Sequence, residues 1–274
     1  MVRRREDGYH EVRMIMQTIH LYDLLEIQKI REPGIQIVSN LSFLPVNENN
    51  LVYKAARLLQ EEFALTDGIS VKLTKRIPVA AGMAGGSTDA AAMLYAMNQL
   101  YDLGLSRREL MKRGVQIGAD VPYCLMRGTA LAEGIGEKLT QLPPMIKCPV
   151  LIAKPSISVS TRFVYQNLKL DEQTNHPDID ALMKDIREKD FDGVCAHMGN
   201  VLESVTIPNY PVIAEIKQQM MRSGAKASMM SGSGPTVFGL FEDGETAKRA
   251  LREMKRSGLA KQVYLTTIYN NRRK

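Results

Sequence analysis

The sequence predicts an α+β fold organised as two domains, residues 1–148 and 149–274. Segments with strand and helix patterns mix along the chain without the regular alternation of a doubly wound parallel sheet. The Pro143–Pro144 pair marks a candidate boundary shortly before residue 149, where a second series of strands and helices begins. The length of 274 residues is enough for two domains of modest size.

The first half contains clear strand and helix patterns. We expect strands at Leu24–Ile30 and Ile69–Thr74, the latter because apolar and polar residues alternate. Between them, Asn50 precedes a helix, because apolar residues recur after it at helical spacing. A Gly-rich loop at Pro78–Thr88 leads into a buried helix, rich in Ala, Met and Leu, at Ala90–Leu100. The apolar stripe after Asn50 consists of Leu51, Ala55, Leu58, Leu59 and Phe63.

Local signals indicate further elements in both halves of the chain. Ser106 and Glu109 form a capping-box pattern at the start of a short helix. Strands at Thr129–Ala132 and Glu137–Leu142 flank a turn at Gly134–Gly136. In the second domain we expect a strand at Val150–Ala153, polar helices between Thr161 and Met221, a Gly-rich loop at Ser231–Pro235, a strand at Val237–Phe241, a helix ending at Gly258 and a strand at Val263–Ile268.

The composition is that of an ordinary globular protein, with 45% apolar and 24% charged residues. The formal net charge is +6, which suits an anionic ligand such as a nucleotide. Basic residues cluster only in short runs at Arg3–Arg5 and Arg272–Lys274, and the chain lacks Trp. We interpret those runs as solvated chain ends, so a nucleic-acid partner is not expected.

Cysteine usage and hydropathy indicate the compartment. The chain has three cysteines, an odd number, and they form no C-x-x-C motif. They are widely spaced, at Cys124, Cys148 and Cys195. We therefore expect no disulfide framework, and we expect the protein in a reducing compartment. The sequence shows neither the apolar core of a signal peptide nor a segment long and apolar enough to span a bilayer. We expect a cytoplasmic protein without a membrane partner.

The strongest chemical signal is the Gly-rich loop before the buried helix. A phosphate chain needs backbone N–H groups directed at it and no Cβ in the way. The start of the helix supplies the N–H groups, and Gly82, Gly85 and Gly86 have no Cβ. The hydroxyls of Ser87 and Thr88 add hydrogen-bond donors or Mg²⁺ ligands. The alternative is a flexible turn before a packed helix, because the loop matches neither a P-loop nor G-x-G-x-x-G. The predicted ATP-binding residues here are Pro78, Val79, Ala80, Ala81, Gly82, Met83, Ala84, Gly85, Gly86, Ser87 and Thr88.

A second Gly-rich loop, Ser231–Thr236, has the same character but lies far away in the sequence. Its glycines would let this backbone approach the first loop or a ligand closely. Taken alone, the loop is more simply a turn, so its significance depends on the other motifs. The predicted residues are Ser231, Gly232, Ser233 and Gly234.

Two shorter motifs supply candidate side chains for catalysis and binding. Asp120, in the apolar stretch Gly118–Pro122, is a candidate acceptor for the proton of a substrate hydroxyl, the alternative being a turn or helix-cap residue. In Asp7–His10, Tyr9 offers a flat face for stacking on a base, and His10 offers an edge for pairing with it. Taken alone, a surface turn is the simpler explanation of this motif.

In combination and in this order, the four motifs resemble the GHMP kinase superfamily, which includes galactokinase, homoserine kinase and mevalonate kinase. Pro78–Ala92 is similar to the family's phosphate loop P-x-x-x-G-L-G-G-S-S-x-A-A, with Met and Ala in place of one Leu and one Gly. Ser231–Thr236 is similar to its C-terminal Gly-rich motif. Arg5–His10 and Gly118–Pro122 narrow the resemblance to members whose alcohol substrate is joined to cytidine diphosphate.

The resemblance implies a fold and a role for each motif. The fold is a ribosomal-protein-S5-like N-terminal domain followed by a ferredoxin-like C-terminal domain. Asp120 matches the family's catalytic Asp, Asn50 a residue near the adenine, and Pro78–Thr88 the ATP phosphate loop.

Substrate recognition and the reaction are also implied by the resemblance. Tyr9 and His10 match the cytidine-binding pair, and Tyr165 falls near another substrate-side aromatic. The implied reaction uses ATP and Mg²⁺ to phosphorylate the 2-hydroxyl of a cytidine diphosphate-linked methylerythritol. This small molecule belongs to the non-mevalonate isoprenoid pathway. The motifs do not identify the metal ligands.

The start of the chain departs from the family pattern. The family opens with a strand carrying P-A-K-[IL]-N, whose Lys works beside the catalytic Asp, and no such motif precedes Asp7. From the sequence alone we expect a shortened and poorly active form. One alternative is a non-catalytic nucleotide- or metabolite-binding protein on the same fold. Another is a kinase of a different small alcohol, such as homoserine or mevalonate, although those alcohols carry no base for Asp7–His10 to bind.

Overall fold

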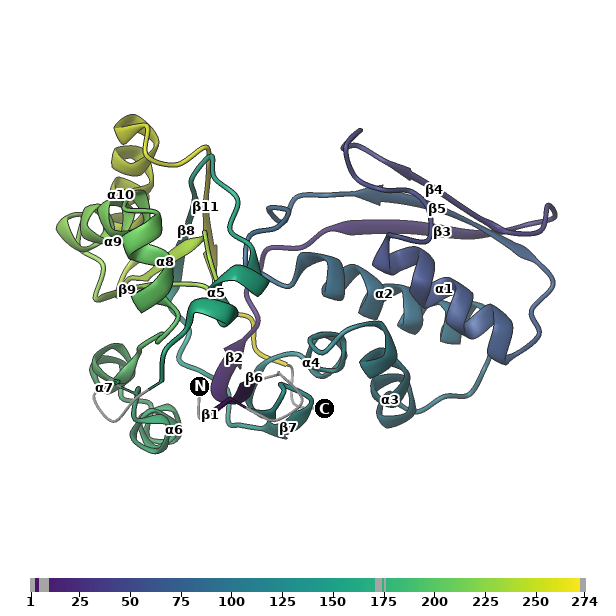
Figure 1. The fold of residues 1–274 in the computed structure, drawn as a ribbon, viewed down its shortest axis with the longest axis horizontal. Helices are drawn as coiled ribbons and strands as arrows, with labels where there is room; N and C mark the ends of the chain where they lie inside the picture. Colours follow the sequence, from purple (N-terminus) through teal and green to yellow (C-terminus); the bar gives the residue numbers. More distant parts are fainter. Residues whose placement is uncertain (1–2, 5–9, 171–173, 175, 272–274) are drawn as a thin grey trace. The chain divides into compact units, whose positions relative to one another are not determined.

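The structure, a computed structural model, describes residues 3–4, 10–170, 174 and 176–271. The chain divides into two compact units, and neither unit is continuous in sequence (Figure 1). The first unit comprises residues 1–20, 80–83 and 128–274, and the second comprises residues 21–79 and 84–127. The boundary expected between residues 148 and 149 stays a prediction.

The second unit is a three-stranded mixed sheet with α1 and α2 packed against it (Figure 1). β5 is the central strand and pairs antiparallel with β3 and parallel with β4. Along β5, Ile69, Val71 and Leu73 are buried while Lys72 is exposed, as the alternation predicts. The elements are β3 Leu24–Ile30, β4 Ile35–Ser39, α1 Leu51–Glu62, β5 Gly68–Thr74, α2 Gly85–Leu100, α3 Arg107–Ile117 and α4 Val121–Met126.

The first unit contains two four-stranded sheets. One has the strand order β1-β2-β6-β7 and is antiparallel throughout. The other has the order β11-β8-β10-β9 and is also antiparallel, which is the strand order of a ferredoxin-like domain. The strands are β1 Arg3–Arg4, β2 His10–Gln17, β6 Thr129–Gly134, β7 Lys138–Gln141, β8 Pro149–Lys154, β9 Ala227–Met230, β10 Val237–Leu240 and β11 Gln262–Thr267.

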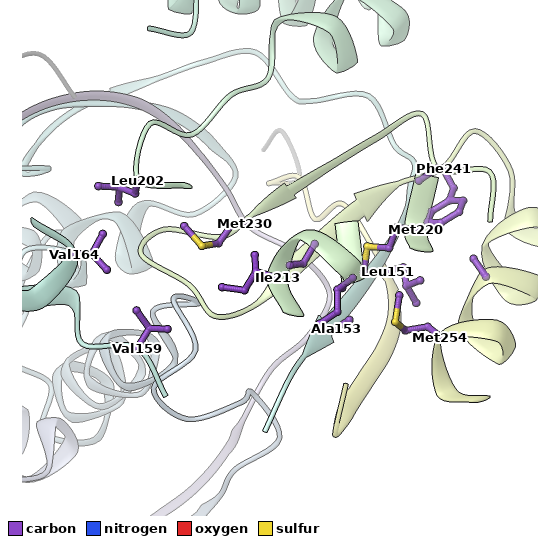
Figure 2. Packing of buried hydrophobic residues seen from close by; sticks show 14 of the residues in the cluster. Leu151, Ala153, Val159, Val164, Leu202, Ile213, Met220, Met230, Phe241 and Met254 are labelled. Carbon is purple, nitrogen blue, oxygen red and sulfur yellow. The ribbon is translucent and has the colours of Figure 1, made fainter. Parts of the chain in front are cut away.

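Helices cover the ferredoxin-like sheet on both faces. In β8, Leu151 and Ala153 face a core that includes residues of α9 and α10 (Figure 2). Val150 and Ile152 point the other way, into a core shared with α6 and α7. Buried strands with two covered faces read as continuous apolar runs, which explains the apolar pattern of this strand. The helices are α5 Thr161–Asn167, α6 Ile179–Glu188, α7 Phe191–His197, α8 Glu203–Asn209, α9 Val212–Arg222 and α10 Gly244–Ser257.

The predicted α+β class is confirmed, and local signals located several elements well. Asn50 caps α1, and its side-chain oxygen accepts a hydrogen bond from the Val52 N–H. Ser106 and Glu109 form the predicted capping box of α3. α10 ends at Gly258, which adopts a left-handed conformation with φ of 71°.

Three features differ from the sequence-based expectations. α2 begins at Gly85 rather than after Thr88, so the last part of the predicted loop is the first turn of the helix. Glycine has a low helix propensity, and packing overrides it here. His10 begins a strand rather than lying in a surface turn, and β4, α4 and β9 were not anticipated. Within the described part of the chain, no helix is long and apolar enough to cross a membrane.

Candidate active site

The Gly-rich segment, residues 78–88, ends in an uncapped helix start. Ala84 is the N-cap residue of α2, in a left-handed conformation with φ of 50°, and its methyl group cannot cap the helix. The first turn of α2 contains no acidic residue, and Gly86 is exposed. The first backbone N–H groups of a helix lack partners within the helix and carry its positive dipole end. This turn therefore offers N–H donors to an anion.

The two Gly-rich loops meet within the first unit. The Ser231 hydroxyl donates a hydrogen bond of 2.8 Å to the carbonyl oxygen of Gly82. A Cβ built on Gly82 would lie 2.2 Å from the carbonyl oxygen of Ser231, and the φ of Gly82 is 68°. Only glycine tolerates both this approach and this backbone conformation. The structure therefore shows the loop-to-loop approach that the glycines permit, whereas contact of the second loop with a ligand stays a prediction.

Side chains from neighbouring helices and loops hold the second Gly loop, residues 231–236. The Asn200 amide donates to the carbonyl oxygens of Met230 at 2.9 Å and Gly232 at 2.8 Å. The hydroxyls of Thr161 and Ser233 lie 2.9 Å apart. The loop is therefore fixed by contacts on several sides rather than being an unsupported turn.

Asp120 is the N-cap residue of α4, yet its side chain forms no capping hydrogen bond. Burial raises the pKa of Asp120 above its ordinary value. One helical turn later, the Cys124 thiol accepts a hydrogen bond of 3.4 Å from the Thr88 hydroxyl, in the first turn of α2. Asp120, the predicted general base, therefore lies at the start of α4, and the end of the Gly-rich segment forms the start of α2. These two helices pack against each other in the second unit.

Asn50 has a structural role. It is 8% exposed, its side-chain oxygen caps α1, and its amide donates a 2.7 Å bond to the carbonyl oxygen of Pro45. Both ends of the side chain are thus engaged. A place near adenine, implied by the resemblance, stays a prediction.

The predicted substrate residues His10 and Tyr165 lie together in the first unit. Their rings form an edge-to-face pair with centroids 5.3 Å apart, and His10 is buried. His10 begins β2 and Tyr165 lies in α5, so residues far apart in sequence form one aromatic pair. Tyr9 lies outside the described residues.

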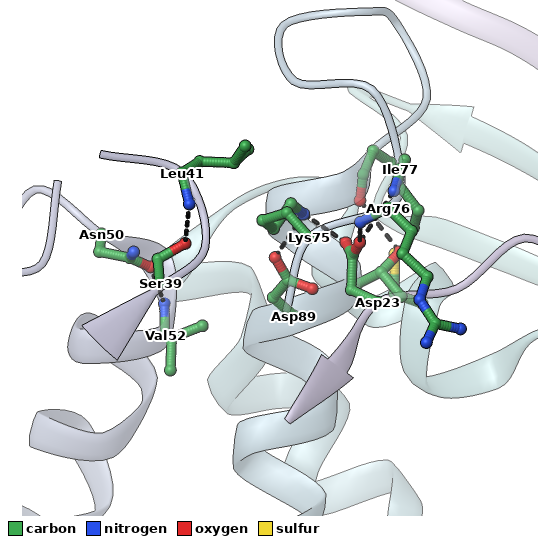
Figure 3. A network of polar contacts seen from close by, with 12 residues as sticks. Asp23, Ser39, Leu41, Asn50, Val52, Lys75, Arg76, Ile77 and Asp89 are labelled. Atoms are coloured by element: carbon green, nitrogen blue, oxygen red, sulfur yellow. Dashed lines mark hydrogen bonds and ion pairs between the residues drawn. The ribbon is translucent and has the colours of Figure 1, made fainter. Parts of the chain in front are cut away.

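A buried ionic cluster, not predicted from the sequence, is formed by Asp23, Lys75 and Asp89 (Figure 3). The Lys75 ammonium forms ion pairs with Asp23 and, at 2.7 Å, with Asp89. Burial raises the pKa of Asp89 to about 7, although Lys75 opposes the shift. Within the described residues, Asp89 Oδ1 forms no hydrogen bond.

A signal for this cluster was present in the sequence. Lys75 continues the odd-numbered, buried face of β5 beyond Leu73. Asp89 lies on the same buried stripe of α2 as Met93 and Met97, at spacings of one and two helical turns. Charged residues at buried positions of two apolar patterns indicate that they pair with each other.

Comparisons with known proteins agree with these features. The GHMP kinases N terminal domain matches residues 50–128, and the GHMP kinases C terminal domain matches residues 182–260. The 4-diphosphocytidyl-2-C-methyl-D-erythritol kinase of Lachnospira eligens is 57% identical over 98% of this chain and 93% of its own. The enzyme of the same name from Lachnoclostridium phytofermentans is 53% identical over 99% and 94%.

Solved structures show the same fold. A crystal structure of a 4-(cytidine 5'-diphospho)-2C-methyl-D-erythritol kinase matches with a TM-score of 0.84 and 30% identity, covering 98% of this chain and 94% of the other. A homoserine kinase from Cytophaga hutchinsonii matches with a TM-score of 0.77 at 22% identity, covering 93% and 89%. The second of these likenesses concerns the fold alone.

Proposed function

The chain belongs to the GHMP kinase family, and we propose that it transfers the γ-phosphoryl group of ATP to the 2-hydroxyl of 4-diphosphocytidyl-2-C-methyl-D-erythritol. The products are ADP and the 2-phosphate of that alcohol. The proposal places the enzyme in the cytoplasm, in the non-mevalonate route to isoprenoid precursors. It is supported by near full-length similarity to curated kinases of that name.

One observation carries the phosphoryl-transfer part of the proposal. The uncapped start of α2 and the partly buried carboxyl of Asp120 lie in the same unit, at the starts of two packed helices. The first suits a phosphate chain and the second suits a proton acceptor. Phosphoryl transfer depends mainly on positioning and on compensation of charge, and this arrangement supplies both.

The residues of the Gly-rich segment fit a nucleotide with its metal ion. Gly85 and Gly86 leave the start of α2 without side chains, so the backbone N–H groups can reach phosphate oxygens. The hydroxyls of Ser87 and Thr88 follow in the same turn. The Ser87 hydroxyl is a candidate ligand or donor, and the Thr88 hydroxyl, which donates its proton within the protein, is a candidate ligand through its oxygen. Mg²⁺, when bound, would offset negative charge on the transferring group.

Asp120 takes the proton in this proposal. The substrate hydroxyl oxygen bonds to the γ-phosphorus as the bond from that phosphorus to the ADP oxygen breaks. The hydroxyl proton passes to the Asp120 carboxylate. Its raised pKa makes this carboxylate a stronger base than an exposed Asp.

Binding of the cytidine part is assigned to Tyr9, His10 and Tyr165. The edge-to-face pair of His10 and Tyr165 supports a shared site for a base, because it joins two residues that the resemblance implicated separately. Aromatic stacking is worth about 1–3 kcal/mol per base.

A substrate comparison tests the proposal. ADP release is measured with the cytidine diphosphate-linked alcohol, its uridine analogue, homoserine and mevalonate, each with ATP and Mg²⁺. We expect turnover with the cytidine compound and none with the two small alcohols. Turnover of homoserine or mevalonate in preference would refute the substrate assignment, and ATP binding without any turnover would favour a non-catalytic protein.

The role of Asp120 is tested separately. Asp120→Asn should retain ATP and the cytidine substrate while turnover falls by about 10²–10⁴-fold, the usual effect of losing a general base. Asp67→Asn, which changes an exposed Asp in the same unit, is the matched control and should leave turnover unchanged. Near-normal turnover by Asp120→Asn would remove this residue from the mechanism.

A further inference from the structure

We propose that Asp23 is a positioning residue for ATP binding, which acts on the Gly-rich segment through Lys75 and through backbone N–H groups. The proposal rests on the assignment of ATP phosphates to the start of α2. It assigns a role to the ionic cluster of Asp23, Lys75 and Asp89, none of which the proposed mechanism uses.

Asp23 holds the chain where it enters the Gly-rich segment. Its Oδ1 accepts hydrogen bonds from the N–H groups of Arg76, at 2.5 Å, and Ile77, at 2.8 Å (Figure 3). These are the last backbone donors before Pro78, which has no N–H. Its Oδ2 forms the ion pair with Lys75. One carboxylate therefore fixes three consecutive residues ahead of the segment.

Lys75 extends the same contact to the helix that follows the segment. Its ammonium lies 2.7 Å from Oδ2 of Asp89, in the second turn of α2. A Cβ built on Gly85 would lie 3.3 Å from the Lys75 ammonium and 3.0 Å from a methyl carbon of Ile77. The first residue of α2 thus packs directly on the cluster. The cluster joins the residues before the segment to the helix after it.

The burial of the cluster makes its geometry strict. The side chains of Asp23, Lys75 and Asp89 are only 1%, 3% and 4% exposed. A buried charge is tolerated only when it is paired and hydrogen-bonded, so none of the three can turn away without a large cost. The charged groups facing Asp89 are Lys75 and Asp23. The thiol of Cys124 on α4 also faces it but stays neutral, because burial raises its pKa to about 12.

Stability alone does not account for this arrangement. Well-packed apolar side chains in place of a buried ion pair are often equally stable or more so. What apolar side chains cannot supply is an acceptor for the N–H groups of Arg76 and Ile77. The cluster therefore sets the direction in which the backbone enters the Gly-rich segment, and with it the orientation of the phosphate-binding turn.

Equilibrium binding of ATP and of the cytidine substrate, measured separately, tests the proposal without depending on turnover. Asp23→Ala removes both the backbone acceptor and the charge, and should raise the Kd for ATP by about tenfold or more. Asp23→Asn keeps an oxygen for Arg76 and Ile77, and should recover part of that loss. The Kd for the cytidine substrate should change less than twofold in both variants.

The control is Glu62→Ala, which breaks an ion pair with Arg113 in the same unit and should leave the Kd for ATP unchanged. An unchanged Kd for ATP in Asp23→Ala overturns the proposal, and so does an equal loss of affinity for both ligands. If Asp23→Ala does not fold, Asp23→Asn decides, since a wild-type Kd for ATP there also overturns it. Failure of the substrate assignment would appear differently, as a wild-type chain that binds ATP but does not phosphorylate the cytidine compound.

Discussion

At Gly82 the Gly-rich segment meets the second Gly loop through a close backbone approach and one uncharged hydrogen bond from the Ser231 hydroxyl. By contrast, Asp23, Lys75 and Asp89 hold the two ends of the segment through buried charges. The first contact depends on the absence of a Cβ and carries no net charge. The second depends on one ammonium shared by two carboxyl groups. The difference means that shape controls one part of the segment, while charge and protonation control the other.

The largest effect is expected from removing the shared charge of the cluster. Lys75→Met leaves two buried carboxyl groups without their counter-ion and should lower the free energy of unfolding by about 3–5 kcal/mol. Chemical denaturation measures this change. The control Lys72→Met changes a lysine of β5, three residues before Lys75, and breaks an exposed pair with Glu26 of β3. It should cost no more than about 1 kcal/mol. Equal costs for the two variants would contradict the special position of Lys75.

The charge-based contact should also respond to pH. Because the pKa of Asp89 is raised in the folded protein, the folded state binds more protons than the unfolded state between about pH 4 and 7. The stability gained from protonated Asp89 is complete at low pH and is lost as the pH rises through about 7. The slope is at most about 1.4 kcal/mol per pH unit. Denaturation between pH 5 and 8 should show this slope in the wild type and a flatter curve in Asp89→Asn, and identical curves would contradict it.

The shape-based contact should be sensitive to a single methyl group. Gly82→Ala combines a strained φ with a clash against the Ser231 carbonyl, and should cost about 1–3 kcal/mol. Gly258→Ala is the control, because Gly258 has a similar φ of 71° but no atom within 4 Å of its Cβ position. The difference between the two variants in thermal unfolding isolates the clash. A Gly82→Ala variant no less stable than Gly258→Ala would show that the loops separate easily.

The smallest effect is expected from the hydroxyl that joins the two loops. Ser231→Ala removes one partly exposed hydrogen bond to Gly82 and should cost about 0.5–1.5 kcal/mol. Ser204→Ala, which loses a local hydrogen bond to Val201 in the same unit, is the matched control for stability. If Ser231 matters for the loop contact, Ser231→Ala should also weaken ATP binding, whereas Ser204→Ala should not.

Features with a local cause were predictable from the sequence. Asn50, the Ser106–Glu109 pair and Gly258 mark helix ends because their side chains, or the lack of one, act on the nearest backbone groups. The two Gly-rich loops were recognisable for the same reason, and their approach followed from what glycine permits. Short motifs first made Asp120 and His10 candidates beside simpler alternatives, and the resemblance then implied their roles. Those roles stay predictions, because their chemistry depends on ligands.

Features with a long-range cause were not predictable in the same way. Nothing near Asp23 in the sequence indicates Lys75, which lies 52 residues away. The start of α2 at Gly85 depends on packing of Gly85 against Lys75 and Ile77, which local propensity does not include. The pairing of the buried charges depends on how β5 and α2 pack in the folded protein. The sequence therefore indicates only that these residues face inward, and not which residues they pair with.

The discontinuity of the first unit limits how such proteins can be rebuilt from parts. Residues 80–83 belong to the same unit as residues 128–274, and the Gly82–Ser231 bond joins them. The Tyr269 N–H likewise donates to the Thr18 carbonyl oxygen, so β2 and the C-terminal segment share one network. A gene divided between codons 148 and 149 would place these partners on separate polypeptides. A chimaera built from the two halves of different relatives would therefore have to keep these contacting pairs of residues matched. Chimaeras made without regard to the pairs should contain loops that do not fit each other.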